Sequence, residues 1–198
     1  MTANTTSWAV LDEAHEALRT VVRGVADGDW ALPTPCSSWN VTQVLQHAAG
    51  DQTAFAAFIT GGPGPTEDPF APSGTLAADA RGVAEEAMKA AADAWATVAA
   101  DAENVSVPVP PGKLPAAVGA GACALDAAVH AWDIAAATGQ PSPLTPGLAR
   151  VLMDVAERIV EPLRAYGAYG PALETRDGDD DVAVLLRYLG RDPRWSAR

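Results

Sequence analysis

Three residues of this sequence, His47, Asp126 and His130, have the side-chain types and surroundings of metal ligands. Asp126 and His130 are four residues apart in an alanine-rich segment, ALDAAVHAWDIAAATG. In a helix this spacing places both side chains on one face, about 40° apart around the axis. The pair fits two interpretations equally well: a buried aspartate–histidine hydrogen bond, or two ligands of one metal ion. His47 lies in a second apolar segment, where a lone histidine is more often a core residue than a ligand.

The other reactive side chains give weaker signals. His15 is flanked by glutamates, which favours a solvated or capping position on a helix. Cys123 lies one helical turn before Asp126, but a small buried thiol is a more frequent role than a fourth ligand. Cys36 lies in a proline-bearing stretch with no base beside it. The pattern therefore favours metal chemistry over nucleophilic catalysis by a cysteine.

Apolar residues recur at three- and four-residue spacing through most of the chain, which predicts helices. Asn40 or Ser38 is the expected cap of the second helix, and Gly139 the residue that ends the fourth. The alternating valines of NVSVPVP are interrupted by prolines, which allow an edge segment at best. One connection is long, so we expect an all-α bundle. The predicted helices are about 6–25, 40–60, 75–100, 115–138 and 146–164, with a short one between 179 and 190.

Composition limits the possible partners. The chain has 198 residues, 48% of them hydrophobic, and a formal net charge of -12. Such a negative surface repels phosphate backbones and anionic lipid, so we expect neither nucleic acid nor a membrane as partner. The start of the sequence has no basic, apolar leader, which predicts a cytoplasmic protein, and its two cysteines are expected as free thiols. We expect one domain over 1–198, with core helices over about 6–138 and a C-terminal extension over 139–198.

Three segments together resemble the DinB-like superfamily, in its actinobacterial branch related to mycothiol-dependent maleylpyruvate isomerases. PTPCSSWNVTQVLQHAAG is similar to the loop and helix that carry the first metal histidine of the family. LDAAVHAWDIAAATG is similar to the stretch that carries the other two ligands, and LLRYLGRDPRW to the C-terminal close of the family. The three similar segments occur in order over almost the whole chain.

The resemblance implies a DinB-like antiparallel four-helix bundle with additional C-terminal helices, and a divalent ion held by His47, Asp126 and His130. The characterised isomerases have Glu where this chain has the shorter Asp126. Nitrogen and oxygen donors suit Zn, Ni, Co or Fe, of which Zn and Ni are the first choices. Asp133 is a candidate hydrogen-bonding partner of a metal ligand, but bracing of the helix packing is the stronger expectation. Trp39 and Trp132 are candidates for the core or for a pocket wall, with the core favoured.

The resemblance also implies a function: a mycothiol-dependent thiol transferase or isomerase-like enzyme, in which the metal activates a small-molecule thiol against an electrophilic substrate. The sequence offers no assured carboxylate-binding arginine for maleylpyruvate, so thiol transfer is the stronger expectation. The alternative is a non-catalytic metal-binding or small-molecule-binding protein of the same fold, so whether the chain is an enzyme stays open. A homodimer is expected by analogy with the family.

Overall fold

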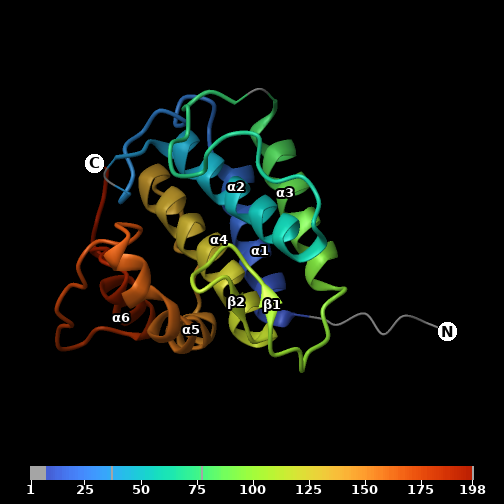
Figure 1. The fold of residues 1–198 in the computed structure, drawn as a ribbon. Helices are drawn as coiled ribbons and strands as arrows, with labels where there is room; N and C mark the ends of the chain where they lie inside the picture. Colours follow the sequence, from blue (N-terminus) through green and yellow to red (C-terminus); the bar gives the residue numbers. More distant parts are fainter. Residues whose placement is uncertain (1–7, 37, 77, 198) are drawn as a thin grey trace.

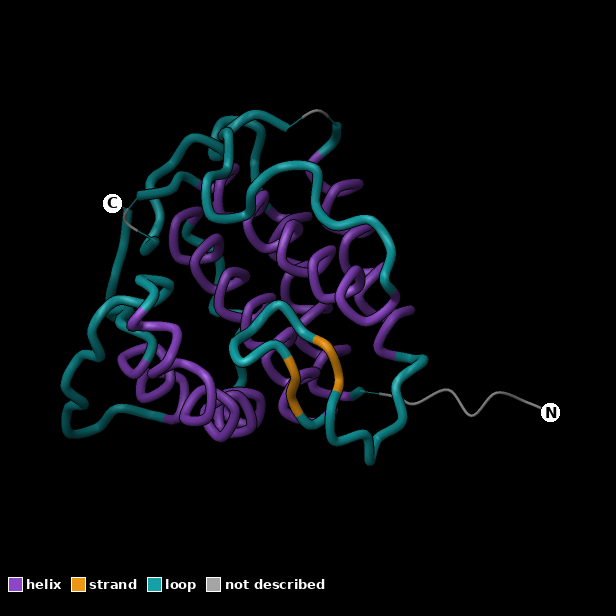
Figure 2. Tube along the Cα trace, in the orientation of Figure 1, coloured by secondary structure: helices purple, strands orange, loops and turns teal. Residues whose placement is uncertain are grey.

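The computed structural model describes residues 8–36, 38–76 and 78–197, and these are mostly helical (Figure 1, Figure 2). The all-α class predicted from the sequence is confirmed. Within the described residues, the strands are a two-residue antiparallel pair, β1 (Val105–Ser106) and β2 (Lys113–Leu114), at the valine-rich edge segment. The helices are α1 (Ala9–Gly24), α2 (Val41–Thr60), α3 (Ala80–Trp95), α4 (Ala116–Thr138), α5 (Pro146–Ala165) and α6 (Asp181–Tyr188).

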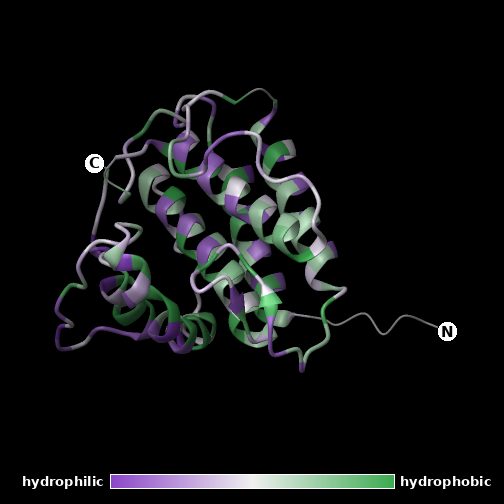
Figure 3. Cartoon of the chain, in the orientation of Figure 1, coloured by the Kyte–Doolittle hydropathy of each residue, from purple (hydrophilic) through white to green (hydrophobic). Residues whose placement is uncertain are grey.

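The first four helices pack together as a bundle. α1 contacts α3 and α4, α2 contacts the same two helices, and α5 and α6 extend the fold from the side of α4 (Figure 1). Alanine and glycine allow the close approach: a Cβ atom on Gly121 of α4 would lie 2.5 Å from Val155 Cγ2 of α5. Among the described residues, no helix is long and apolar enough to span a membrane. The loop between α5 and α6 is largely hydrophilic (Figure 3).

Local signals set the helix ends that position the candidate site. Asn40 caps α2: its side chain accepts a hydrogen bond from the Gln43 N–H, and the Gln43 side chain accepts one from the Asn40 N–H. Gly139 ends α4 in the left-handed conformation, with φ of 70°. The predicted start of the third helix near Thr75 is wrong, because Asp79 caps the helix and starts it at Ala80. The first residues predicted for α1, Thr6 and Ser7, lie outside the described residues.

The segment between α2 and α3 runs back along α2 rather than away from it (Figure 2). Gln43 donates a hydrogen bond to the Pro72 carbonyl, and the Gly74 N–H donates one to Gln46. Gly50 allows the contact, since a Cβ atom there would lie 2.9 Å from Pro69 Cγ. These contacts hold the segment against the α2 face that carries His47.

Candidate metal centre

The structure brings His47, Asp126 and His130 together where α2 crosses α4. One nitrogen of each histidine and one carboxylate oxygen of Asp126 all lie within 4.8 Å of one another. Asp126 Oδ1 is 3.5 Å from His47 Nε2 and 3.4 Å from His130 Nε2. The two imidazole rings lie 4.7 Å apart between centroids, at an interplanar angle of 85°. Sequence spacing placed Asp126 beside His130, and only the fold adds His47.

The second ring nitrogen of each histidine has its own acceptor. His47 Nδ1 lies 2.9 Å from the Pro69 carbonyl oxygen, and His130 Nδ1 lies 2.9 Å from Asp133 Oδ2. A carbonyl and a carboxylate accept hydrogen bonds, so we assign the proton of each neutral ring to Nδ1. Both Nε2 lone pairs are then free to bind a cation, as in most histidine-ligated metal sites.

Asp126 has a carboxylate oxygen that is available to a cation. Its Oδ2 atom is buried and has no hydrogen-bond partner, which is rare for a charged oxygen. Two imidazole nitrogens and one carboxylate form a donor set used by catalytic zinc and related divalent ions. The side chains of His47, Asp126 and His130 therefore fit a divalent cation and could hold one.

Burial and neighbouring charges shift the pKa values of Asp126, His47 and Asp51. Burial alone would raise the pKa of Asp126, but the charges of His130 and His47 outweigh it and lower that pKa. Burial lowers the pKa of His47, but the hydrogen bond and charge of Asp126 and the charge of Asp51 raise it to about 9. Burial and the charge of Asp126 raise the pKa of Asp51 to about 7. Asp51 Oδ2 lies 3.8 Å from His47 Nε2, so a second carboxylate borders the triad.

Asp133 links His130 to the C-terminal segment. The Arg191 guanidinium forms two hydrogen bonds with its carboxylate, of 2.9 Å to Oδ1 and 2.8 Å to Oδ2. Asp133 is fully buried, and the nearby guanidinium and His130 hold its pKa below the usual range in spite of burial. The expectation that Asp133 mainly braces helix packing is incomplete, because the same carboxylate orients His130. Through Arg191, the C-terminal segment contacts the carboxylate that orients His130.

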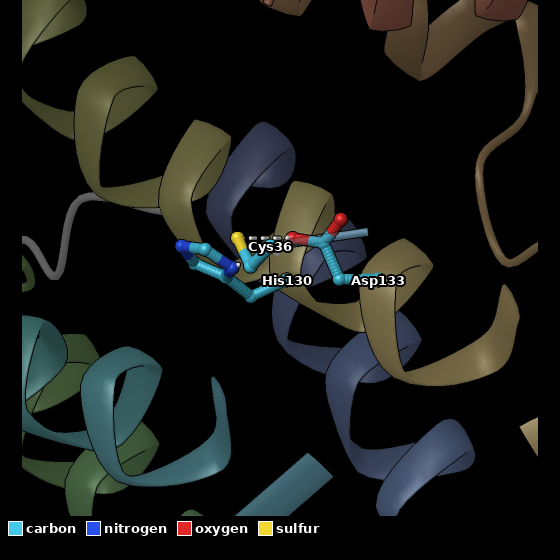
Figure 4. Close-up of side chains that lie close together, drawn as sticks. All are labelled: Cys36, His130 and Asp133. Carbon is cyan, nitrogen blue, oxygen red and sulfur yellow. Dashed lines mark hydrogen bonds and ion pairs between the residues drawn. The ribbon is translucent and has the colours of Figure 1, made fainter. Parts of the chain in front are cut away.

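Cys36 lies in this network, contrary to the expectation that no base is beside it. Figure 4 shows its thiol directed at the Asp133 carboxylate next to His130, and Cys36 Sγ lies 3.4 Å from Asp133 Oδ2. Burial and the Asp133 charge raise the pKa of Cys36 to about 12. A protonated thiol donates a hydrogen bond, so Cys36 supports Asp133 and is no nucleophile here. Cys36, His130 and Asp133 form a second group whose possible ligand atoms lie within 4.8 Å of one another. Arg191 already neutralises the Asp133 carboxylate, which makes this group the weaker candidate for a metal site.

Aromatic side chains border the triad. The Trp39 ring lies 4.7 Å from the His47 ring and the Phe70 ring 5.5 Å from it, between centroids. Trp39 is half-buried against His47, which fits the pocket-wall alternative, whereas Trp132 is buried in the core. Tyr169 follows α5, and burial together with the charge of Asp126 raises the pKa of its phenol above the usual range.

A buried polar network lies one turn away from the triad. Gln52 of α2 joins three helices: its Oε1 lies 2.8 Å from His15 Nε2 of α1, and its Nε2 donates to the Cys123 carbonyl of α4. The Cys123 thiol also donates to Gln52 Oε1, at 3.0 Å. The solvated position expected for His15 is therefore wrong, since it is buried. Cys123 is a buried free thiol as predicted, and Cys36 is free as well.

Several supporting groups were missed by sequence reasoning. Pro69 contributes a backbone carbonyl, for which no residue type is diagnostic. Asp51 lies four residues after His47, a spacing that puts it on the same helix face and could have identified it. Pro69 also lines a cavity of about 420 Å³ between α2, the following segment and α3.

The chain is similar to known proteins over the segments that carry the candidate site. A family model described as the mycothiol maleylpyruvate isomerase N-terminal domain matches residues 11–135, which include all three triad residues. Two Mycobacterium tuberculosis proteins, from strains CDC 1551 / Oshkosh and ATCC 25618 / H37Rv, are each described as uncharacterized. Each is 32% identical over 188 residues, covering 91% of this chain and 95% of the relative. No solved structure matches.

Proposed function

The chain belongs to the mycothiol maleylpyruvate isomerase N-terminal domain family, and from this premise we propose that it is a divalent-metal protein that activates a small-molecule thiol. The convergence of His47, Asp126 and His130, with both Nδ1 atoms already satisfied, carries this proposal. The family description names mycothiol, which makes mycothiol the first thiol to test. The proposed reaction is thiol transfer to an electrophile, or an isomerisation that proceeds through such a transfer.

In this proposal the ion would lower the pKa of a bound thiol or water, which supplies a nucleophile at neutral pH. The chain's own residues prepare the site for it. Pro69 and Asp133 fix the orientation of the two imidazoles, so that the Nε2 lone pairs converge without rearrangement. Asp51 Oδ2, 3.8 Å from His47 Nε2, is placed to accept the proton that a thiol releases.

The remaining features of the proposal rest on chemistry and on analogy. The nitrogen and oxygen donors favour Zn or Ni. The acidic composition supports small-molecule rather than nucleic-acid partners, and family analogy supports a homodimer. We also propose a cytoplasmic location.

Asp51 also favours a second candidate, a metal-binding protein without catalysis. If its carboxylate completed the coordination shell, four protein ligands would close the site, as in structural zinc sites. Asp51→Asn separates the two candidates: it should lower metal affinity sharply in a closed site. In an open catalytic site it should leave the affinity within a few-fold and slow thiol transfer instead.

Elemental analysis of untagged protein, purified without chelator, tests the proposal first. We expect about one equivalent of transition metal in the wild type. His47→Ala and His130→Ala should lose it, whereas His15→Gln, which changes the histidine outside the triad, should retain it. Consumption of mycothiol by the loaded protein in the presence of an electrophile then tests the enzyme. No bound metal after reconstitution with Zn and Ni would refute the proposal.

A further inference from the structure

The surroundings of the triad restrict which molecules reach it, and this inference rests on the proposed function. The side chains of His47, Asp126 and His130 keep 8%, 11% and 9% of their exposure, so the site is narrow but not sealed. Asp51, at 21%, is the more exposed neighbour. A ligand approaching the ion therefore meets the groups that border the triad before it meets the triad.

Two of those groups are aromatic and come from opposite ends of α2. Trp39 precedes the helix and Phe70 belongs to the segment that folds back along it, yet both rings contact the His47 ring. Phe70 is 64% exposed, although it adjoins a buried histidine. The Pro69 carbonyl, one residue before Phe70, accepts the His47 hydrogen bond and so fixes Phe70 at the edge of the site. An aromatic ring held there leaves apolar surface available to a ligand.

Two carboxyl groups face His47 at the site. Asp51 Oδ2 lies 3.8 Å and Asp126 Oδ1 lies 3.5 Å from the same atom, His47 Nε2. Arg191, the guanidinium of this network, is paired with Asp133 through two hydrogen bonds and contacts the Cys36 sulfur with Nη2. It lies on the Nδ1 side of His130, behind the metal-facing nitrogen. Arg191 is therefore committed to a buried carboxylate and is not available to a substrate carboxylate.

We infer that the metal site selects an uncharged electrophile whose apolar group packs against Trp39 and Phe70, and that it discriminates against substrates bearing a carboxylate. The aromatic pair supplies contact area next to the ion. A carboxylate brought into this narrow site would lose water and would find the Arg191 guanidinium already paired with Asp133, which weakens its binding. The thiol would remain the nucleophile and the ion its activator, as proposed above.

Hydroxamates that bind to the cobalt-loaded protein test this inference without any turnover. Cobalt(II) absorbs visible light, and its spectrum changes when a hydroxamate coordinates. Acetohydroxamate, benzohydroxamate and 4-carboxybenzohydroxamate share the metal-binding group and differ in the apolar ring and the carboxylate. We expect benzohydroxamate to bind about tenfold more tightly than acetohydroxamate, from burial of the ring. The carboxylate should weaken binding by at least about fivefold.

Variants assign the two effects to their residues. Phe70→Ala should bring the benzohydroxamate and acetohydroxamate affinities together. Phe58→Ala is the matched control, because Phe58 is also exposed on α2, eleven residues beyond His47. The penalty of the carboxylate should persist in Phe70→Ala, because Arg191 stays paired with Asp133 in that variant. Equal affinities of the three hydroxamates in the wild type would overturn the inference, and so would tighter binding of the carboxylate. A cobalt spectrum that no hydroxamate changes would overturn it while leaving the metal site intact, and failure to bind cobalt would overturn the proposed function itself.

Discussion

Replacing Asp133 should damage both the fold and the metal site, and the two effects can be separated. Asp133 is fully buried, and the Arg191 side chain paired with it is 10% exposed. Removing one partner of a buried ion pair leaves the other charge without compensation, which costs about 3–5 kcal/mol. For a chain of this size each kcal/mol lowers Tm by roughly 2–4 °C. Asp133→Asn should therefore lower the Tm of the metal-free protein by about 6–20 °C.

The same substitution removes the charged acceptor that orients His130. Loss of such a supporting hydrogen bond typically weakens metal binding by about 10–100-fold. The affinity is measured by competition with a chromogenic chelator, well below the unfolding temperature of each variant. Arg150→Met is the control, because Arg150 pairs with Asp181 on the surface. An exposed pair contributes about 1 kcal/mol at most, so this variant should change neither quantity appreciably.

A double variant, Asp133→Leu with Arg191→Met, distinguishes orientation from stability. It removes the uncompensated charge, so most of the lost stability should return. His130 Nδ1 still lacks its acceptor, so the metal affinity should stay low. If the double variant regained wild-type affinity together with its stability, Asp133 would act only through the fold. If Asp133→Asn bound metal like the wild type while stably folded, the assigned role of Asp133 would be wrong.

Three further predictions follow from separate features. Cys36, with its pKa raised to about 12, should react with iodoacetamide at neutral pH much more slowly than an unfolded control peptide, and a fast reaction would contradict its assignment as a donor. Because a metal must displace the proton that His47 holds up to about pH 9, affinity should rise about tenfold per pH unit below that value, and a flat titration profile would exclude this competition. Gly121→Ala, whose Cβ would lie 2.5 Å from Val155, should lower stability by about 1–3 kcal/mol in denaturant unfolding, whereas Gly28→Ala, which meets nothing within 4 Å, should not.

The helices were predictable because their signals are local. Ala-rich periodicity marked α4, and the side chain of Asn40 and the positive φ of Gly139 set two helix ends where the sequence placed them. His15 was misplaced because its glutamate neighbours were weighted more than the helix face. Leu11, His15 and Leu18 lie at four- and three-residue spacing on the buried stripe of α1.

The candidate site was only partly predictable, for a physical reason. The pairing of Asp126 with His130 follows from one helical turn, but their meeting with His47 depends on how α2 crosses α4. Here the resemblance to a family supplied what periodicity could not. Asp133 and Arg191 are 58 residues apart, so no local pattern joins them.

The buried amide of Gln52 sets the axial alignment of two helices. Gln52 lies five residues after His47, and it forms hydrogen bonds with the carbonyl and the thiol of Cys123 in α4, three residues before Asp126. A slip of one residue along either axis would shift the ligand atoms by about 1.5 Å, which is most of a metal–ligand bond length. The register of α2 against α4 is thus held by a neutral, hydrogen-bonded anchor inside the core rather than by the ion. The ligand atoms would therefore keep their alignment without a metal, and a cation would bind to a preformed site.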